Sequence, residues 1–422
     1  MSSPAPSVQA DAHVPKPVRA PFIALYAFAM FGIWMSIMLP ASVTLALRIS
    51  QIDPDGKNVS YSIAAGVGTL VALIANPLFG RLSDRTRSRF GRRRPWIVIG
   101  LAGTIVGAII IGLSNSFPLL LLGWIIMQAF VNAAIAATLA IVPDRVPPRQ
   151  QGLVGALSGM ASSAAVLVGV FFVQWFPTNV LAQFGLPVLV AVLFAGLLVA
   201  LFRDDQPAPA DIGPFDFREF FGSFYINPRT SPDFAKFLLA LFLVACGMGV
   251  ISTYTVYLLQ DRVMPPEAEL PGLITLAYVI PGIVAVISAP VAGWLNDRTG
   301  RRKLVLGAAA LFIAAGILVL AAADTVPLFM IGLVLVAGFG TGIAYGSYIG
   351  FAVATMNDPA TAARDLGVVN IALSLPYSVM PFIAPLLLSI GGGTSNYPAL
   401  LIVSAVLTLL SFIPMLLVRT TR

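Results

Sequence analysis

The chain alternates between long apolar runs and short polar loops, and this alternation restricts it to one environment. Twelve runs approach or exceed the length of about 20 residues that a helix needs to cross a bilayer. The runs cover 21–47, 61–81, 96–115, 117–142, 152–177, 184–202, 234–259, 271–295, 304–323, 326–356, 367–390 and 398–418. Only 10% of the residues are charged, too few for a water-compatible surface. The sequence therefore predicts an all-α integral membrane protein with twelve transmembrane helices.

A short cationic motif occurs twice, each time between two apolar runs. The first copy extends from Gly80 to Arg94 and the second from Gly293 to Lys303, so the two leading glycines are offset by 213 positions. A second repeated segment ends at Gly152 in the first half of the chain and at Gly367 in the second half, and its two copies are offset by 215 positions. The two nearly equal offsets indicate an internal duplication. Two copies of one six-helix membrane unit are typical of solute transporters.

The duplication divides the chain into regions. We expect a disordered cytoplasmic tail over 1–19, an N-terminal six-helix bundle over 20–202, a cytoplasmic linker with an interfacial helix over 203–233, a C-terminal six-helix bundle over 234–418 and a cytoplasmic tail over 419–422. If the N-terminus is cytoplasmic, 22 of the 25 Lys and Arg residues lie on the inner side. This distribution follows the positive-inside rule, so the net charge of +7 reflects membrane topology without a nucleic-acid partner. We expect a monomer in the cell membrane, namely a bacterial inner membrane, in contact with membrane lipids.

The repeated motif combines residue types suited to a gate. A glycine at Gly80 or Gly293 lets helices approach closely, and a carboxylate at Asp84 or Asp297 is favoured near a helix N-terminus. Neighbouring arginines can pair with that carboxylate or with anionic lipid headgroups. A simple orientation anchor would explain the arginines but not the matched Gly and Asp. The predicted gate residues are Gly80, Asp84, Arg85, Arg92, Asp144, Arg145, Gly293, Asp297, Arg298, Arg301, Arg364 and Asp365.

The motif pattern G-x-L-x-D-R-x-G-R-R-K resembles the cytoplasmic loop signature of the major facilitator superfamily, between spans 2 and 3 and between spans 8 and 9. The resemblance implies two six-helix bundles around a central cavity, with Asp84 and Asp297 closing the inner gate when the cavity faces outward. The longer first copy, which continues to Trp96, is similar to that of sucrose and glycoside carriers. The stretch from Arg364 to Pro376 also resembles that glycoside-pentoside-hexuronide-like branch.

The interior of the spans is polar without being charged. All 18 acidic residues fall in loops, in tails or at span ends, and no Lys, Arg or His lies in the middle of a span. Amide and hydroxyl groups beside aromatic rings suit a neutral polyhydroxylated ligand such as a sugar. Ordinary interhelical hydrogen bonding is the alternative for each residue. The candidate substrate-binding residues are Trp34, Gln128, Asn132, Tyr254, Tyr257, Tyr345, Tyr348, Asn370 and Tyr377.

Three functions fit these features. The first is a secondary transporter, active or facilitative, for a sugar or glycoside; the second is an exporter of lipophilic drugs or lipids; the third is a receptor or scaffold that lost transport. Without a mid-span carboxylate, we expect facilitated diffusion, or coupling to protons through Asp84, Asp144, Asp297 or Asp365. We find no nucleophile–base pair, metal-ligand cluster or phosphate-binding loop in the sequence, so we expect no enzyme activity, no cofactor and no metal.

Overall fold

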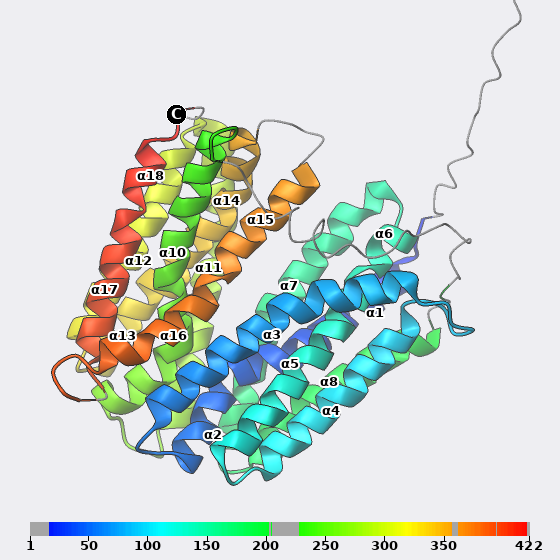
Figure 1. Ribbon diagram of the computed structural model, residues 1–422, viewed down its shortest axis with the longest axis horizontal. Coiled ribbons are helices and arrows are strands. Elements are labelled where there is room, and N and C mark those ends of the chain that lie inside the picture. The colour runs from blue at the N-terminus through cyan, green and yellow to red at the C-terminus, as the bar shows by residue number, and fades with distance from the viewer. Residues whose placement is uncertain (1–16, 202–203, 205–227, 357–361, 394, 420–422) are drawn as a thin grey trace, which may run out of the picture.

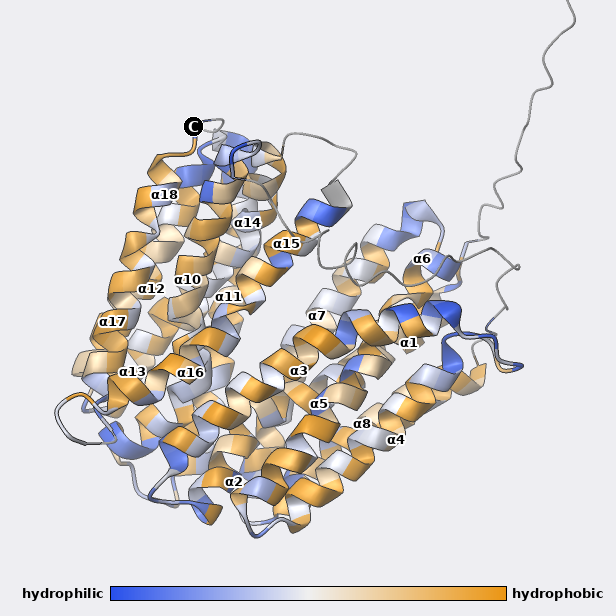
Figure 2. Ribbon diagram, viewed as in Figure 1, coloured by the Kyte–Doolittle hydropathy of each residue, from blue (hydrophilic) through white to orange (hydrophobic). Residues whose placement is uncertain are grey.

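The computed structural model describes residues 17–201, 204, 228–356, 362–393 and 395–419. Within these residues, twelve helical stretches are long and apolar enough to cross a membrane, as the apolar runs predict. Figure 2 shows hydrophobic residues along the helices and hydrophilic residues gathered at their ends. The predicted interfacial helix of the linker falls mostly on 205–227, and the predicted N-terminal tail mostly on 1–16, so both lie outside the described residues.

The first six spans follow one another with short connections. They are formed by α1 (Ala20–Leu39) with η1 (Pro40–Thr44) and α2 (Leu45–Ile52), α3 (Lys57–Arg85), α4 (Arg94–Leu113), α5 (Phe117–Leu139) with α6 (Ile141–Arg145), α7 (Pro148–Trp175) and α8 (Val180–Leu201). The helices extend past the predicted runs into polar residues. Span 2, for example, starts at Lys57 and ends at Arg85. Its first and last turns carry polar side chains, which can face water beyond the apolar part of the helix.

The last six spans repeat this arrangement. They are formed by α10 (Pro232–Leu258) with η2 (Leu259–Val263), α11 (Leu270–Thr299), α12 (Arg302–Ala322), α13 (Val326–Leu333) with η3 (Val334–Gly340) and α14 (Thr341–Thr355), α15 (Ala362–Ser374) with α16 (Pro376–Leu388), and α17 (Tyr397–Leu410) with α18 (Phe412–Leu416). Span 11 is interrupted at Pro376, since α15 ends at Ser374 and α16 begins at Pro376. By contrast, α11 continues through Pro281 and Pro290.

Three spans contain a π-helical segment. The segments η1 and η2 lie near corresponding ends of spans 1 and 7, and η3 lies within span 10. Pro40 has no N–H to donate, so a proline at the start of η1 disturbs the regular hydrogen-bond ladder. Such segments leave carbonyl groups available to other partners and often occur at functional sites.

Figure 1 shows two helical bundles whose ribbons come together at the bottom of the view and spread apart toward the top. Helix α3 packs against α16, and α7 packs against α11. A Cβ atom at Gly66 would lie 2.7 Å from the Phe382 ring, so the first pair of helices approaches closely there. We call the bottom end, which contains residues 42–62 and 254–278, the seal end. The opposite end, which contains both copies of the repeated motif, is the basic end.

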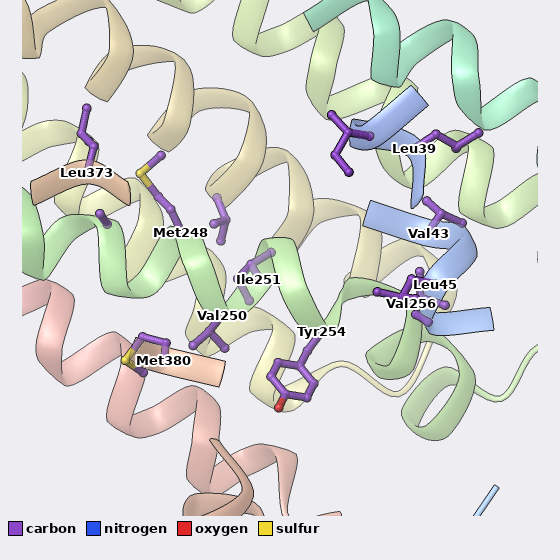
Figure 3. Close-up of a cluster of buried hydrophobic side chains, with 14 of the residues drawn as sticks. Leu39, Val43, Leu45, Met248, Val250, Ile251, Tyr254, Val256, Leu373 and Met380 are labelled. Carbon is purple, nitrogen blue, oxygen red and sulfur yellow. The ribbon is translucent and has the colours of Figure 1, made fainter. Parts of the chain in front are cut away.

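The hydrophobic core is continuous from one bundle to the other near the seal end. Figure 3 shows Val43 and Leu45 of span 1 close to Val256 of α10, with Tyr254 about half a turn earlier in α10. All four side chains are at most 1% exposed. In a bilayer the lipid tails are as apolar as these side chains, so close packing, rather than removal from water, makes the contact favourable and joins the bundles at the seal end.

Candidate functional site: two gates and a neutral polar lining

The first copy of the repeated motif forms an ion-pair cluster that joins the ends of three spans. The Arg93 guanidinium lies 2.6 Å from the Asp84 carboxylate at the end of α3 and 2.8 Å from the Asp144 carboxylate on α6. Arg92 lies 2.5 Å from the other oxygen of Asp144. Asp84 therefore does pair with an arginine of its own motif. The predicted gate role of Asp84, Arg92 and Asp144 stays a prediction, as it does for the flanking Arg85 and Arg145.

Arg93 is the centre of this cluster, although the sequence did not distinguish it from the adjacent arginines. Its side chain is 4% exposed and also donates a hydrogen bond of 3.0 Å to the Ser83 hydroxyl. Burial lowers the pKa of Arg93, but the carboxylates of Asp144 and Asp84 raise it by more, so the net shift is upward. The guanidinium therefore stays charged. Three successive arginines look alike in the sequence, and only the fold decides which one is buried.

Asp204, which follows span 6, binds the same motif loop. Its Oδ2 atom accepts hydrogen bonds from the backbone N–H groups of Arg93 (2.6 Å) and Arg94 (3.0 Å) at the start of α4. The carboxylate fits because residue 91 is a glycine with φ of +91°, where a Cβ atom would collide with Asp204. The start of the linker is thus attached to the first gate motif, a contact that the sequence analysis did not predict.

The second copy of the motif is arranged differently. The described residues include no ion-pair partner for Asp297, which is exposed, and Arg298 lies over the Trp294 ring at 5.2 Å. Asn296 is buried, and neither of its side-chain polar atoms has a hydrogen-bond partner in the described part of the chain. Further along, Arg364 pairs with Asp365 at 3.0 Å at the start of α15. The two motif copies are therefore related in sequence but differ in the ion pairs that their described residues form.

In this conformation the motif glycines make no tight helix contact, and their predicted gate role stays a prediction. A Cβ atom at Gly80 would lie 3.9 Å from its nearest neighbour, Ala136, and one at Gly293 would lie 3.4 Å from the Gly346 carbonyl. Both are ordinary contacts. The bundles meet at the seal end, whereas Gly80 and Gly293 lie in the last two turns of α3 and α11, toward the basic end. The ribbons of the two bundles diverge at that end (Figure 1).

The seal end contains a polar lock between the bundles. Lys57 of α3 lies 2.5 Å from one carboxylate oxygen of Asp261 in η2. The Tyr397 hydroxyl donates to the other oxygen at 2.6 Å and lies 2.9 Å from the Asn58 side chain. The hydroxyl groups of Ser62 and Tyr254 form a hydrogen bond with each other nearby. All hydrogen bonds between the described residues of the two bundles fall at this end, so the bundles are closed here.

Tyrosine hydroxyls also bind the backbone around η1. Tyr278 of α11 donates to the Ser42 carbonyl at 2.6 Å, and Tyr257 of α10 donates to the Ala46 carbonyl at 3.1 Å. Tyr61 of α3 donates to the Ala41 carbonyl at 3.0 Å. Residues 41–46, in η1 and the first turn of α2, thus accept hydrogen bonds from three phenol groups, two of them from the other bundle. Tyr254 and Tyr257, predicted as substrate-binding residues, are fully buried in this lock in the present conformation.

The predicted polar residues of the N-terminal bundle lie together on α5 and α3. The Asn132 side chain donates to the Gln128 carbonyl at 2.8 Å and accepts a hydrogen bond from Asn76 at 3.4 Å. The Gln128 amide nitrogen lies against Gly68, where a Cβ atom would be 3.1 Å away. Gln128 and Asn132 are each 7% exposed. Trp34 of α1 is partly buried against the core.

The predicted residues of the C-terminal bundle form a second group. The rings of Tyr345 and Tyr348 meet edge to face with centroids 6.0 Å apart, and the Tyr345 and Tyr377 phenols interact. Tyr345 is 47% exposed, and Tyr377 and Tyr348 are half-buried. Asn370 on α15 is exposed and lies 3.5 Å from the Ser374 hydroxyl. Three tyrosines from two spans therefore offer phenol groups that the core does not bury completely.

The sequence matches the family profile of the Major Facilitator Superfamily over residues 22–362 and again over 268–422. The chain belongs to the major facilitator superfamily. It is a multi-pass membrane protein with twelve spans and the fold of a transporter. The nucleoside transporter NupG has a similar structure, with a TM-score of 0.73 at 12% identity, covering 94% of this chain and 98% of that one.

Two curated relatives show how widely substrates vary within the superfamily. The chain is 26% identical to a triacylglyceride transporter of Mycolicibacterium smegmatis, over 69% of this chain and 58% of that protein. It is 30% identical to the mouse solute carrier family 2 facilitated glucose transporter member 10, over 68% of this chain and 55% of that protein. The chain thus spans somewhat more than half the length of these relatives.

A row of glycines lets span 10 of this superfamily member pack closely on span 8. Cβ atoms at Gly338, Gly342 and Gly346 would each press on α11, and the one at Gly346 would collide with the Ala289 backbone. Gly350 has nothing within 4 Å of such an atom. Close backbone approach through small residues stabilises helix pairs in membranes.

We therefore expect Gly346→Ala to destabilise the protein by about 1–3 kcal/mol, the usual cost of overpacking. Gly350→Ala is the matched control and is expected to be neutral, because the added methyl group meets open space. Thermal unfolding of both variants in detergent measures the difference. Equal unfolding midpoints for the two variants would contradict the close α11–α14 contact.

Proposed function

We propose that the protein is a secondary transporter that moves a neutral polyhydroxylated solute, a sugar or glycoside, by alternating access. The observation that carries this proposal is a pair of polar groups without net charge, one in each bundle. Gln128 and Asn132 belong to the first group, and Tyr345, Tyr377 and Asn370 to the second. Amides and phenols bind hydroxyl groups, and aromatic rings stack on the apolar face of a sugar.

The conformation fits one step of alternating access. The lock of Lys57, Asp261 and Tyr397 joins the bundles at the seal end. If the basic end faces the cytoplasm, as the positive-inside rule requires, this is an inward-facing state. Transport then needs a state in which the lock opens and the basic end closes, and the predicted gate residues Asp84 and Asp297 belong to that end. On this proposal the termini are cytoplasmic and the membrane is the bacterial inner membrane.

The relatives support different substrates. The glucose transporter relative favours the sugar proposal, and the triacylglyceride transporter relative favours the lipophilic alternative. The glycoside-carrier branch indicated by the extended first motif stays part of the proposal. The absence of a mid-span carboxylate in the sequence favours a facilitative mechanism over coupling through a buried acid.

Uptake into proteoliposomes tests the proposal. Purified protein is reconstituted and offered labelled glucose, sucrose and a β-glucoside, with and without a pH gradient, beside empty vesicles. We expect at least one sugar to equilibrate faster than in empty vesicles, and the pH gradient to leave its final level unchanged. Transport of a lipophilic cation in the absence of any sugar uptake would reject the sugar proposal in favour of the exporter.

Two tyrosine-to-phenylalanine variants, one in the proposed site and one outside it, test the site. Tyr377→Phe removes one phenol hydroxyl from the second polar group, and we expect the KM for the transported sugar to rise roughly fivefold to tenfold, the usual cost of one hydrogen bond. Tyr26→Phe is the control, because Tyr26 is fully buried in the core on α1. An unchanged KM in Tyr377→Phe would show that this tyrosine does not bind the solute.

A further inference from the structure

The C-terminal bundle contains an apolar groove that the proposed transport mechanism does not use. Its volume is about 550 Å³, and every residue that lines it belongs to α11, the loop that follows α11, α12, η3 or α14. The groove therefore lies on one bundle and not between the two. Its lining is aliphatic and aromatic over most of its length, including Val284, Val291, Ala308, Phe339 and Ile343.

The groove opens on a surface that the described protein does not cover. Ile287 and Val291 of α11 and Leu304 of α12 are each more than half exposed, and all three lie in membrane-spanning helices. In a bilayer, apolar side chains exposed on spanning helices face the acyl chains of lipids. The one polar side chain in the interior of the groove, Ser288, already donates its hydroxyl to the Gly338 carbonyl at 3.2 Å. The interior therefore presents no free polar group.

The end of the groove at the basic end is positively charged. Thr299 and Arg301 line it there, at the junction of α11 and α12. Arg301 is exposed and forms no ion pair within the part of the chain that the structure describes. Lys303 is close by but is already used, since its ammonium donates to the Val418 carbonyl. An apolar channel that ends at an available guanidinium matches a ligand with a hydrocarbon chain and an anionic head.

We propose that this groove binds an anionic phospholipid of the leaflet at the basic end, with one acyl chain along α11 and α12 and the phosphate on Arg301. Charge selects the lipid class, because a guanidinium prefers a headgroup with net negative charge over a zwitterionic one. The groove is distinct from the proposed sugar site. This proposal does not depend on the identity of the transported solute.

Native mass spectrometry of the full-length protein in detergent tests the proposal. Dioleoyl phosphatidylglycerol and dioleoyl phosphatidylcholine are titrated separately, and we expect the first lipid to bind with the higher affinity. Arg301→Gln is expected to weaken phosphatidylglycerol binding about fivefold, the contribution of one basic residue near an anionic headgroup. Arg302→Gln makes the same change of charge at a residue that does not line the groove, and we expect it to bind as the wild type does.

A second pair of variants tests the acyl-chain contact. Ala308→Phe fills the groove and is expected to weaken phosphatidylglycerol binding about tenfold, whereas Leu311→Phe changes an exposed residue outside it and is expected to have no effect. Excess glycerol 3-phosphate, which has the headgroup phosphate without acyl chains, is expected not to displace the lipid. Equal affinities for the two lipids, equal losses in Arg301→Gln and Arg302→Gln, or displacement by glycerol 3-phosphate would each overturn the proposal.

Discussion

Replacing Arg93 with alanine is expected to lower the stability of the protein by about 2–3 kcal/mol, with a fall of roughly 5 °C in the unfolding temperature. The side chain is buried and joins Asp84, Asp144 and Ser83. Removing one partner of a buried ion pair costs about 3–5 kcal/mol, because the other charge is left uncompensated. We expect less here, since Asp144 keeps Arg92 and the Asp84 side chain is 49% exposed.

Arg94→Ala is the matched control for this prediction. Arg94 is the next residue in the chain, and its guanidinium forms no ion pair among the described residues. The unfolding of both variants is followed by tryptophan fluorescence in detergent, and transport is followed in proteoliposomes. We expect Arg93→Ala to lose both stability and transport rate, and Arg94→Ala to keep the stability of the wild type. Similar unfolding temperatures in the two variants would show that the ion-pair cluster does not stabilise the fold.

Replacing Asp261 with asparagine is expected to shift the protein toward a state open at the seal end by about tenfold. Asp261 accepts from both Lys57 and Tyr397, and asparagine carries no charge to attract the ammonium group. Hydrogen bonds to a charged group contribute about 1.5–3 kcal/mol each, so the loss of one such interaction changes the ratio of closed to open states by an order of magnitude.

Cysteine labelling measures this shift. The single native cysteine is first replaced by Cys246→Ser, and Val43→Cys is introduced as a reporter, because Val43 is fully buried at the seal end (Figure 3). A membrane-impermeant maleimide added at the seal side is expected to react about tenfold faster in Asp261→Asn.

Glu267→Gln is the control for the labelling experiment. Glu267 lines the same polar pocket at the seal end as Lys57 and Asp261, but it has no ion-pair partner in the described part of the chain. We expect it to label at the wild-type rate. A Lys57→Met/Asp261→Asn double variant leaves no ammonium group unpaired. We therefore expect its increase in labelling rate to be smaller than the combined increases of the Lys57→Met and Asp261→Asn single variants. Unchanged labelling in Asp261→Asn would mean that the lock does not control opening.

The spans and the superfamily were predictable from the sequence, because both depend on local features. A bilayer requires long apolar helices, and the repeated motif carries its own spacing. The glycine row of span 10 was predictable for the same reason, since glycines at 338, 342 and 346 must lie on one helix face. The kink before α16 followed from Pro376 alone.

The lock at the seal end was not predictable in the same way. Lys57 and Asp261 are 204 residues apart in the chain, and nothing near either residue indicates the other. Tyr254 and Tyr257 look like lining residues in the sequence, but the rotation of α10 turns both toward the other bundle. Arg93 and Asp204 pose the same problem, because only the folded loop brings the carboxylate to the backbone of α4. Pairing across distant segments needs the fold.

The attachment of Asp204 to the start of α4 has a mechanical consequence. If the two bundles rock against each other as proposed, the points at which the connecting chain is attached to each bundle become important. On the N-terminal side, that attachment includes the hydrogen bonds that Asp204 accepts from the backbone N–H groups of Arg93 and Arg94, beside the end of span 6. A pull on the connecting chain would therefore act on the start of α4, where Arg93 pairs with Asp84 and Asp144. Movement of the C-terminal bundle would then reach the charge cluster of the N-terminal bundle without a contact between their helices.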